Sequence, residues 1–408
     1  MSTDPHIFFA YTDEVLAFAW KDRADDVQPP APPATEELER MAERSLRLFE
    51  KSHKDTLVLF GLCSGALATT LAERLPAETR LLICDLSPER TREVLRYSKP
   101  AWYTSSSRTQ LLVDTSPWAH VHLLSLVDAG PARACLQLNP EAASSEKTLL
   151  QALQRTLTLA RPHSAINGTS FGHFAVQAPS LSAACILHPD EPDLDGFFRQ
   201  FPDWVQELVV VWDAEQVPEQ SINAACPVRQ TARPLGEDFA AQRNHMLKHC
   251  QAEWVLYLDA DERLSEDHWV MLPGLFPVRG VQGYFFPRLT FHPDEEHCRI
   301  GYGLWPDLQL RLFRNQPEVR FENAIHEKIT GLSGRAGLVL DAPLLHYSHS
   351  RKKPEALREK LALFDRASRG AVHHTLNENY PHLPLSRFRR ANLLCNELQV
   401  LLLPEMPL

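Results

Sequence analysis

The chain has 408 residues, of which 44% are hydrophobic and 23% are charged, and its formal net charge is -10. This length is enough for two domains. The acidic balance argues against general binding to nucleic acid or to an anionic membrane, because both need a basic surface. No apolar run approaches the roughly 20 residues that span a bilayer, and the start of the chain lacks a basic flank followed by an apolar stretch. We therefore expect a cytoplasmic protein without an integral membrane segment, and we allow for peripheral association.

The eight cysteines are spread along the chain, and no CxxC pair occurs among them. Such pairs are typical of zinc sites and redox centres, so their absence favours an ordinary packing role. Isolated cysteines behave as small hydrophobic residues in a protein core. We therefore interpret them as buried free thiols.

The first half of the chain predicts an α/β domain that follows an extension. Residues 1–50 carry a Pro-rich spacer, PPAPPAT, and an amphipathic run that favours a helix from Glu36 to Lys51. Short apolar runs then alternate with helical segments, as a βαβ unit requires. Residues 51–178 are therefore predicted to form a Rossmann-like domain. Its expected strands are 56–61, 80–85, 121–127 and 132–139, and its expected helices are 66–74, 89–97 and 146–159.

Two glycines mark the first strand-to-helix turn of this domain. Gly61 and Gly65 lie in GLCSGALATTLAERL, and Asp85 ends the next strand. Glycines at such a turn let the backbone approach a ligand, and a following acid can accept hydrogen bonds from ribose hydroxyls. Domains that bind nucleotides or S-adenosylmethionine use this arrangement, although the spacing here is GxxxG rather than GxGxxG. The three residues therefore indicate either a ligand site or a packing turn.

A second α/β series begins near residue 181. Asp238 precedes one of its helices, where a negative charge favours the positive end of the helix dipole. That helix leads directly into the apolar run WVLYLDADERL. The whole chain is therefore expected to be an α/β protein of two domains. The strands expected in this half are 181–187, 207–213, 254–264, 283–292 and 308–315, and the helices are 196–201, 238–250 and 355–371.

Three acids gather at the end of WVLYLDADERL: Asp259, Asp261 and Glu262. Alternation along an extended backbone places Asp259 and Asp261 on the same side, where two carboxylates can hold one hard divalent cation or its waters. Mg²⁺ and Mn²⁺ bind between such carboxylates and substrate phosphates, and they neutralise charge as a phosphate-bearing group departs. The pattern predicts a metal site for a diphosphate, and the alternative is a solvated acidic turn.

Four blocks follow one another in residues 181–350: AAQRNHMLKHCQAEWVLYLDADERLSED, LWPDLQLRLFRN, FENAIHEKI and LLHYSHS. They resemble the family 2 glycosyltransferases of the GT-A fold, especially bacterial relatives of the lipopolysaccharide core transferases. Four blocks in order are far more specific than a lone DxD motif. The resemblance implies a GT-A nucleotide-sugar-binding domain over residues 179–350, and it leaves residues 351–408 as a helical extension.

The resemblance implies an inverting, metal-dependent glycosyltransferase of cell-surface glycoconjugate synthesis. Its partners would be a nucleotide-diphosphate sugar as donor and a glycan or a protein as acceptor. Asp259 and Asp261 would hold Mn²⁺ or Mg²⁺, and His326 would serve as a third ligand. Asp213 ends a strand where the family contacts the nucleotide, and Arg243 would meet the donor phosphates beside Asp259.

An inverting transferase also needs a base that takes the proton of the acceptor hydroxyl. By resemblance, this catalytic residue is Glu327 in IHEKI or Asp307 in WPDLQLRLF, and we favour Glu327. His346 and Tyr347 would close the site. The alternatives are a surface ion pair for Glu327 and ordinary packing for His346 and Tyr347.

Two stretches depart from the family pattern. HPDEPD at 188–193 replaces an Asn-Glu pair, and AEQVPEQ at 214–220 replaces a Gly-Ser-Thr-Asp stretch, so recognition of the nucleotide must differ. Asp190 or Glu191 would then replace the first acid. Two other functions stay open: an S-adenosylmethionine-dependent methyltransferase acting through the N-terminal domain, and a non-catalytic scaffold with a degenerate transferase domain.

Overall fold

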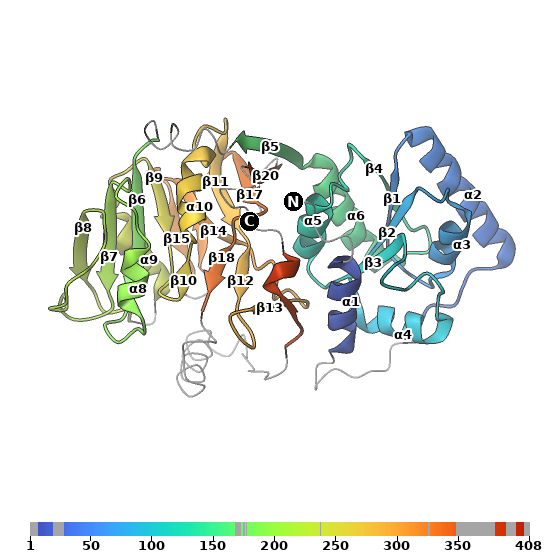
Figure 1. Cartoon of the computed structure of the whole chain (residues 1–408), viewed down its shortest axis with the longest axis horizontal. Coiled ribbons are helices and arrows are strands. Elements are labelled where there is room, and N and C mark those ends of the chain that lie inside the picture. Colours follow the sequence, from blue (N-terminus) through green and yellow to red (C-terminus); the bar gives the residue numbers. More distant parts are fainter. Residues whose placement is uncertain are drawn as a thin grey trace. The chain divides into compact units, whose positions relative to one another are not determined.

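The protein is an α/β protein that divides into two compact units. The first unit comprises Met1–Ala160, Glu296–Asp307 and Asn379–Arg389, and the second comprises Arg161–Glu295, Leu308–Glu378 and Arg390–Leu408. Figure 1 labels the elements of both units along the chain. In the described part of the chain, no helix combines the length and the apolar composition needed to cross a membrane. The computed structural model describes residues 7–18, 28–167, 173, 176, 178–236, 238–324, 327–347, 380–388 and 397–403.

The first unit is built on a four-stranded parallel sheet in the order β3-β2-β1-β4. All four strands carry buried apolar residues, and the helices α2, α3 and α4 contribute to the same core. The parallel sheet with its crossover helices confirms the α/β pattern expected for this part of the chain. Its strands are β1 (Thr56–Phe60), β2 (Arg80–Asp85), β3 (Thr109–Val113) and β4 (Ala134–Leu138), and its helices are α1 (Ile7–Ala17), α2 (Thr35–Ser52), α3 (Ala66–Arg74), α4 (Pro88–Ser98), α5 (Pro117–Leu126) and α6 (Ser144–Leu159).

One predicted strand of the first unit is wrong. The run VHLLSLV, at 121–127, lies in the helix α5 and its C-cap rather than in a strand. Pro117 occupies the first turn of that helix, where a missing backbone N–H costs nothing. The helix is buried on nearly all sides, so its apolar residues show no period of 3.6. A short apolar run of this kind has the same pattern in a buried helix and in a buried strand.

A segment from late in the sequence completes the first unit. Tyr11 on α1 hydrogen-bonds Asp114, which directly follows β3. The backbone N–H of Gly301 donates to the Tyr11 hydroxyl at 3.1 Å, and that of Gly303 donates to Asp114 at 3.2 Å. Residues 296–307 therefore belong to the core of the first unit, together with β13 (His297–Arg299), β19 (His382–Pro384) and the short helix η3 (Leu385–Arg387).

The second unit is built on a nine-stranded mixed sheet in the order β5-β20-β17-β11-β14-β9-β6-β7-β8. The strands β9, β6, β7 and β8 run parallel to one another, and β14 pairs with β9 antiparallel. The carboxyl ends of the four parallel strands therefore meet at one edge of the sheet. The strands are β5 (Arg161–Asn167), β6 (Leu181–Leu187), β7 (Glu207–Trp212), β8 (Val228–Ala232), β9 (Trp254–Tyr257), β11 (Val281–Phe286), β14 (Gln309–Arg314), β17 (Arg335–Val339) and β20 (Glu397–Leu403).

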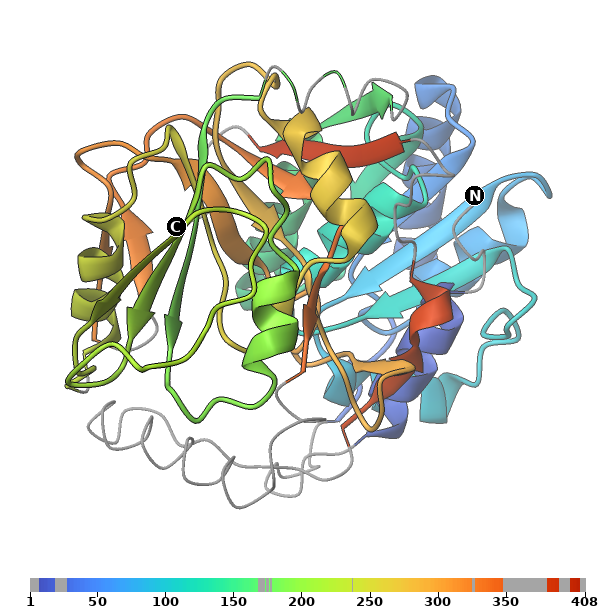
Figure 2. The ribbon, with the colours of Figure 1, turned by 60° about the vertical axis from the view of Figure 1, so that its left-hand side comes forward.

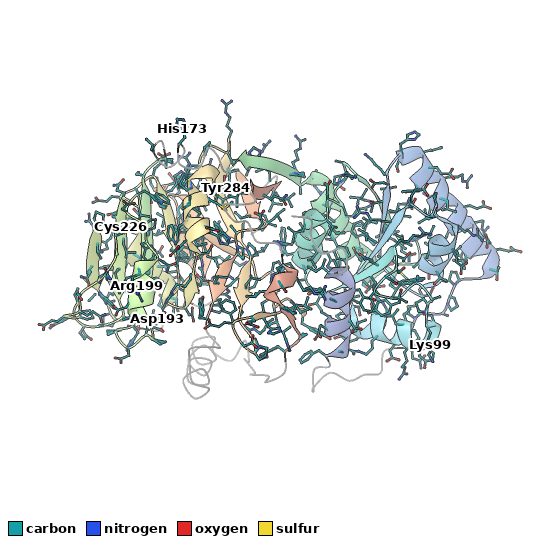
Figure 3. The ribbon with its side chains drawn as sticks, viewed as in Figure 1. Lys99, His173, Asp193, Arg199, Cys226 and Tyr284 are labelled. Atoms are coloured by element: carbon teal, nitrogen blue, oxygen red, sulfur yellow. The ribbon has the colours of Figure 1, made fainter. Side chains whose placement is uncertain are left out.

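Smaller elements of the second unit surround this edge. A three-stranded sheet has the order β10-β18-β12, and a hairpin joins β15 to β16. Asp193 caps the helix α8 by accepting from the backbone N–H of Gly196 at 3.2 Å. Figure 3 shows Asp193 and Arg199 at the two ends of α8. These elements are β10 (Glu262–Arg263), β12 (Arg288–Thr290), β15 (Arg320–Glu322), β16 (Lys328–Thr330), β18 (Leu344–His346), α8 (Leu194–Arg199), α9 (Phe239–Leu247), α10 (Glu266–Met271) and the 3-10 helix η2 (Leu272–Leu275).

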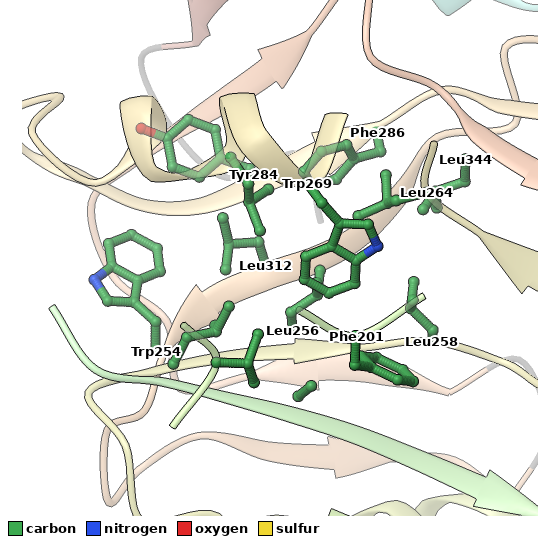
Figure 4. Close-up of a cluster of buried hydrophobic side chains, with 14 of the residues drawn as sticks. Phe201, Trp254, Leu256, Leu258, Leu264, Trp269, Tyr284, Phe286, Leu312 and Leu344 are labelled. Carbon is green, nitrogen blue, oxygen red and sulfur yellow. The ribbon is translucent and has the colours of Figure 1, made fainter. Parts of the chain in front are cut away.

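Alternate side chains of the central strands pack on opposite faces of the large sheet. On β7, Leu208, Val210 and Trp212 belong to the larger hydrophobic core, while Val209 and Val211 belong to a second core. The helices α8 and α10 contribute to the larger core, and α9 contributes to the second. Figure 2 shows α8 and α10 on the near side of the sheet, and Figure 4 shows part of the larger core. Helices therefore pack on both faces of the sheet, and ligands of such folds bind at the carboxyl edge of the parallel strands.

Two predicted strands of the second half are interrupted. The expected strand 254–264 is extended only to Tyr257, turns at Ala260 and Asp261, and resumes as β10. The expected strand 283–292 is divided into β11 and β12 at Pro287, which has no N–H to donate to a ladder. The predicted helix 355–371 lies outside the described residues. The cysteines within the described residues are free and mostly buried, as predicted.

Close packing of two strands gives a first test of the fold. Gly337 on β17 is paired with Tyr284 on β11, and a Cβ at Gly337 would lie 2.5 Å from two carbons of the buried Tyr284 ring. Gly337→Ala is therefore expected to lower the free energy of unfolding by about 1–3 kcal/mol. Urea denaturation measures the change. Gly130→Ala is the matched control, because no atom lies within 4 Å of a Cβ there, and equal stability of the two variants would contradict the packing.

Candidate active site

A tight turn follows β9 at the carboxyl edge of the parallel strands. The backbone N–H of Glu262 donates to the carbonyl of Asp259 at 2.9 Å, and the N–H of Asp259 donates to the Glu262 carboxylate at 3.1 Å. The prediction that alternation places Asp259 and Asp261 on the same side of an extended strand is wrong, because the chain turns between them. The two aspartates consequently have different neighbours.

Asp259 is held by two arginines. Arg243 on α9 donates from Nη2 to Oδ1 at 3.0 Å, and Arg311 on β14 donates from Nη2 to Oδ2 at 2.6 Å. Burial alone would raise the pKa of Asp259, but the positive charges of Arg311 and Arg243 outweigh it and hold the pKa below its ordinary value. Each oxygen of this carboxylate therefore accepts from a guanidinium.

Glu262 is the deeply buried member of the cluster. Its side chain is 0% exposed, and Oε1 accepts from Arg311 at 2.7 Å and from Arg288 at 3.3 Å. Acids are almost never fully buried unless they are paired, so the two arginines explain why Glu262 can occupy this position. Asp259 and Glu262 raise the pKa of Arg311 well above its ordinary value, against the opposing effect of burial.

Arg243 joins Asp259 to Glu327. Its Nε donates to Oε1 of Glu327 at 2.6 Å, and its guanidinium lies over the ring of Tyr257 at 4.8 Å. Asp238 caps α9 by accepting from the backbone N–H of Ala241 at 2.9 Å, and Asn244 exchanges two hydrogen bonds with the backbone of Phe321 on β15. The cap fixes where α9 begins, and the hydrogen bonds of Asn244 attach the helix to β15. The Arg-Asn pair of this helix thus places one residue in the site and anchors the other.

Asp261 faces the three-stranded sheet. Its Oδ1 lies 3.4 Å from Nε2 of His346 on β18, and the other ring nitrogen of His346 lies 2.9 Å from the hydroxyl of Thr290 on β12. The backbone N–H of Tyr347 donates to the carbonyl of Asp261 at 2.9 Å. Because Thr290 fixes one side of the imidazole, the other nitrogen is directed at the Asp261 carboxylate.

The hydrogen-bond partners of these side chains indicate which of them suit a metal ion. Both oxygens of Asp259 accept from guanidinium groups, so Asp259 fits the role of a metal ligand poorly. The carboxylate of Asp261 and the imidazole of His346 do fit, because Mn²⁺ accepts both ligand types and the pair is close enough to share one ion. Within the described residues, no group of three or more His, Cys, Asp and Glu side chains is arranged to hold a metal. His326 lies outside them.

Two other predicted residues have their own partners. Asp213 directly follows β7 at the same edge of the sheet, and its Oδ1 accepts from the backbone N–H of Leu235 at 2.8 Å. Asp307 belongs to the first unit, at the end of the segment that Tyr11 and Asp114 hold. The structure therefore brings together Asp259, Arg243 and Glu327 among the residues singled out from the sequence, with Asp261 beside them.

In the predicted ligand site of the first unit, Asp85 has hydrogen-bond partners within the chain. Gly61 and Gly65 have φ values of 99° and 81°, as a glycine turn requires. Asp85 is fully buried, and its carboxylate accepts from the backbone N–H of Leu62 at 2.8 Å and from Arg90 at 2.9 Å. These internal donors use the oxygens that a ribose hydroxyl would need.

Three residues of the cluster were not predicted to contribute in the way that the structure shows. Arg311 had a usable signal, since a charged residue between Leu310 and Leu312 in a predicted strand must be paired if it is buried. His346 was expected only to close the site, and its pairing with Asp261 depends on the alignment of β18 with β10. No local pattern marks Arg288, which reaches Glu262 only through the tertiary fold.

The known proteins that resemble this chain match only part of its length. No protein-family model matches the chain. A TPR repeat-containing protein of Synechococcus elongatus is 27% identical over 157 residues, which cover 38% of this chain and 37% of that relative. The chain thus matches little more than a third of the relative's length.

Among solved structures, the chain is similar to residues 1–349 of S. aureus TarS, with 14% identity, a TM-score of 0.30, and coverage of 49% of this chain and 67% of that one. It is also similar to glucosyl-3-phosphoglycerate synthase from Mycobacterium tuberculosis in complex with Mn²⁺, uridine diphosphate and phosphoglyceric acid. In that case the identity is 16%, the TM-score is 0.22, and the coverage is 30% of this chain and 46% of that one. Scores this low carry no argument, so the functional case rests on the residues.

The charge of Asp259 predicts a pH-dependent contribution to stability. Because the arginines keep its pKa below the ordinary 3.8, the contribution is complete above about pH 5 and is lost as the pH falls from 3.8 toward the lower pKa of the folded state. Asp259→Asn should therefore be less stable than the wild type by about 1–2 kcal/mol at pH 7, a value reduced for the partial exposure of this side chain. Urea denaturation from pH 7 to pH 3 should show the difference shrinking below pH 5. A difference that is constant with pH would contradict the ion pairs.

Proposed function

We propose that the second unit is a glycosyltransferase of the GT-A type, which moves a sugar from a nucleotide-diphosphate donor to a hydroxyl of a glycan or a protein with inversion at the anomeric carbon. The observation that carries the proposal is the cluster at the carboxyl end of β9, where Asp261 faces His346 and Arg243 joins Asp259 to Glu327. A sheet edge of this kind is where ligands bind in open α/β folds. The four sequence blocks that resemble family 2 transferases supply most of these residues.

The metal site of the proposed enzyme consists of Asp261 and His346 rather than Asp259. A carboxylate and an imidazole suit Mn²⁺, and Mg²⁺ would depend more on Asp261 and on the donor. The bound ion would supply positive charge that stabilises the departing nucleoside diphosphate. Thr290 supports the site by fixing the orientation of the His346 ring.

Arg243 is proposed to bind the donor phosphates. Its side chain is 12% exposed, whereas that of Arg311 is 3% exposed, so Arg243 is the guanidinium closer to solvent. The carboxylates of Asp259 and Glu327 fix the orientation of the Arg243 guanidinium before a ligand binds. A guanidinium fixed in this way can donate two hydrogen bonds to a diphosphate without ordering a flexible chain.

Glu327 is proposed as the catalytic base, with Asp307 as the alternative. In the single displacement, the acceptor oxygen bonds the anomeric carbon while the bond from that carbon to the phosphate oxygen breaks on the opposite face. The hydroxyl proton passes to the Glu327 carboxylate, and the diphosphate leaves with the bonding electrons. The Glu327 side chain is 15% exposed and its position is fixed by Arg243, which suits a group that must meet a bound hydroxyl.

Ligand-dependent thermal shifts test the binding site. Uridine diphosphate, guanosine diphosphate and their sugar conjugates should be compared with and without Mn²⁺, and at least one nucleotide should raise the melting temperature only when Mn²⁺ is present. Asp261→Asn and His346→Ala should abolish that dependence. The exposed Asp203→Asn is the matched control and should retain it. Equal stabilisation with and without the metal, or none in any mixture, would contradict the proposed site.

The assignment of the base is tested by a pair of variants. With a donor and an acceptor identified, Glu327→Gln should reduce kcat by a factor of about 10²–10⁴ and remove the acidic limb of the pH-rate profile, because the amide cannot take the proton. Asp307→Asn should keep most of kcat. The opposite ranking of the two variants would transfer the role of base to Asp307.

The internal partners of Asp85 argue against a methyltransferase function for the first unit. Because Leu62 and Arg90 use both oxygens of this carboxylate, addition of S-adenosylmethionine should leave the melting temperature unchanged. A stabilisation by S-adenosylmethionine that is lost in Gly65→Ala would overturn this prediction and would assign a cofactor site to the glycine turn.

A further inference from the structure

Arg311 is the most deeply buried arginine of the candidate site. It lies on β14 between Leu310 and Leu312, its side chain is 3% exposed, and its guanidinium lies over the ring of Tyr257 at 4.4 Å. It is therefore screened from solvent much more than Arg243. A guanidinium in this position acts on its protein neighbours rather than on a ligand in solution.

A single nitrogen of Arg311 joins the two acids that flank Asp261. Nη2 donates to Oδ2 of Asp259 at 2.6 Å and to Oε1 of Glu262 at 2.7 Å. The same two residues are also linked to each other by the two hydrogen bonds of the turn, from N–H of Glu262 to the carbonyl of Asp259 and from N–H of Asp259 to the Glu262 carboxylate. Both ends of the short turn are thus fixed to β14, and Asp261 projects from the middle.

Asp261 is fixed on its other side by the small sheet. Its carbonyl accepts from the N–H of Tyr347, and Glu262 pairs with His346 across β10 and β18. We propose that Arg311 is a positioning residue for the metal ligand: by clamping Asp259 and Glu262, it holds the turn in the conformation that aims Asp261 at His346. The inference rests on the proposed function, and it concerns a residue that would touch neither the metal nor the substrate.

The shape of the guanidinium, and not only its charge, carries this role. Nη2 of Arg311 reaches both carboxylates while the guanidinium lies over the ring of Tyr257, and a lysine ammonium on a flexible stem does not reproduce this combination. Arg311→Lys therefore keeps the positive charge but loses the clamp. If charge neutralisation were the whole function of Arg311, the lysine variant would behave like the wild type.

The test measures the binding of Mn²⁺ to the full-length protein in the absence of nucleotide. Binding is detected as a decrease in the electron paramagnetic resonance signal of free Mn²⁺. Arg311→Lys should raise the dissociation constant of Mn²⁺ by about 10–100-fold, as is typical when a supporting partner of a metal ligand is removed. Arg314→Lys is the matched control, because Arg314 lies on the same strand and pairs with the partly exposed Glu253; its affinity should equal that of the wild type. The melting temperature of each metal-free variant is measured in parallel.

The outcomes separate this inference from the proposed function. Wild-type binding that is lost in His346→Ala and unchanged in Arg311→Lys would overturn the positioning role and leave the metal site intact. Absence of Mn²⁺ binding in the wild type would overturn both. If Arg311→Lys fails to fold, Glu262→Gln replaces it, since the neutral amide keeps the shape and weakens one arm of the clamp. Affinity reduced several-fold in that variant supports the inference, and unchanged affinity overturns it.

Discussion

The structure of the candidate site depends on the pairing of buried carboxylates with arginines. Asp259, Asp261, Glu262 and Glu327 bring four negative charges together, and Arg243, Arg288 and Arg311 bring three positive ones. Removing these charges from water is costly, and the cost is offset only because nearly every pair is also hydrogen-bonded. The ion pairs of Arg311 with Asp259 and Glu262 fix the turn after β9. In this turn the carboxylate of Asp261 is directed at the imidazole of His346, whereas that of Asp259 is directed at the arginines.

The parallel strands explain why the cluster lies where it does. β9 ends at the carboxyl edge of the parallel strands, and Asp259, Asp261 and Glu262 follow it directly, so the local sequence places these three acids together. The antiparallel β14 then passes beside β9 and delivers Arg311 from a segment far along the chain. Local sequence supplies the acids, and the alignment of distant strands supplies their partners.

The sequence predicted much of the fold and part of the site. The apolar runs at β1, β6 and β7 and the capped start of α9 were recognisable because burial and capping leave local patterns. The helix α5 was not, since a helix buried on all sides has no amphipathic period. The turn at Ala260 was named only as an alternative to a strand, because much of its stabilisation comes from other elements, above all from Arg311 and Arg288. The position of Asp261 beside His346 likewise depends on the pairing of β10 with β18, which no local pattern reveals.

The central claim is that Asp261 and His346, and not Asp259, are the metal ligands. Electron spin echo envelope modulation of bound Mn²⁺ tests it most directly, because a coordinated imidazole nitrogen produces its own modulation. The account predicts modulation from one imidazole in the wild type, its retention in Asp259→Asn and its loss in His346→Ala. An Mn²⁺ signal without nitrogen modulation, or one that survives in His346→Ala, would contradict the account.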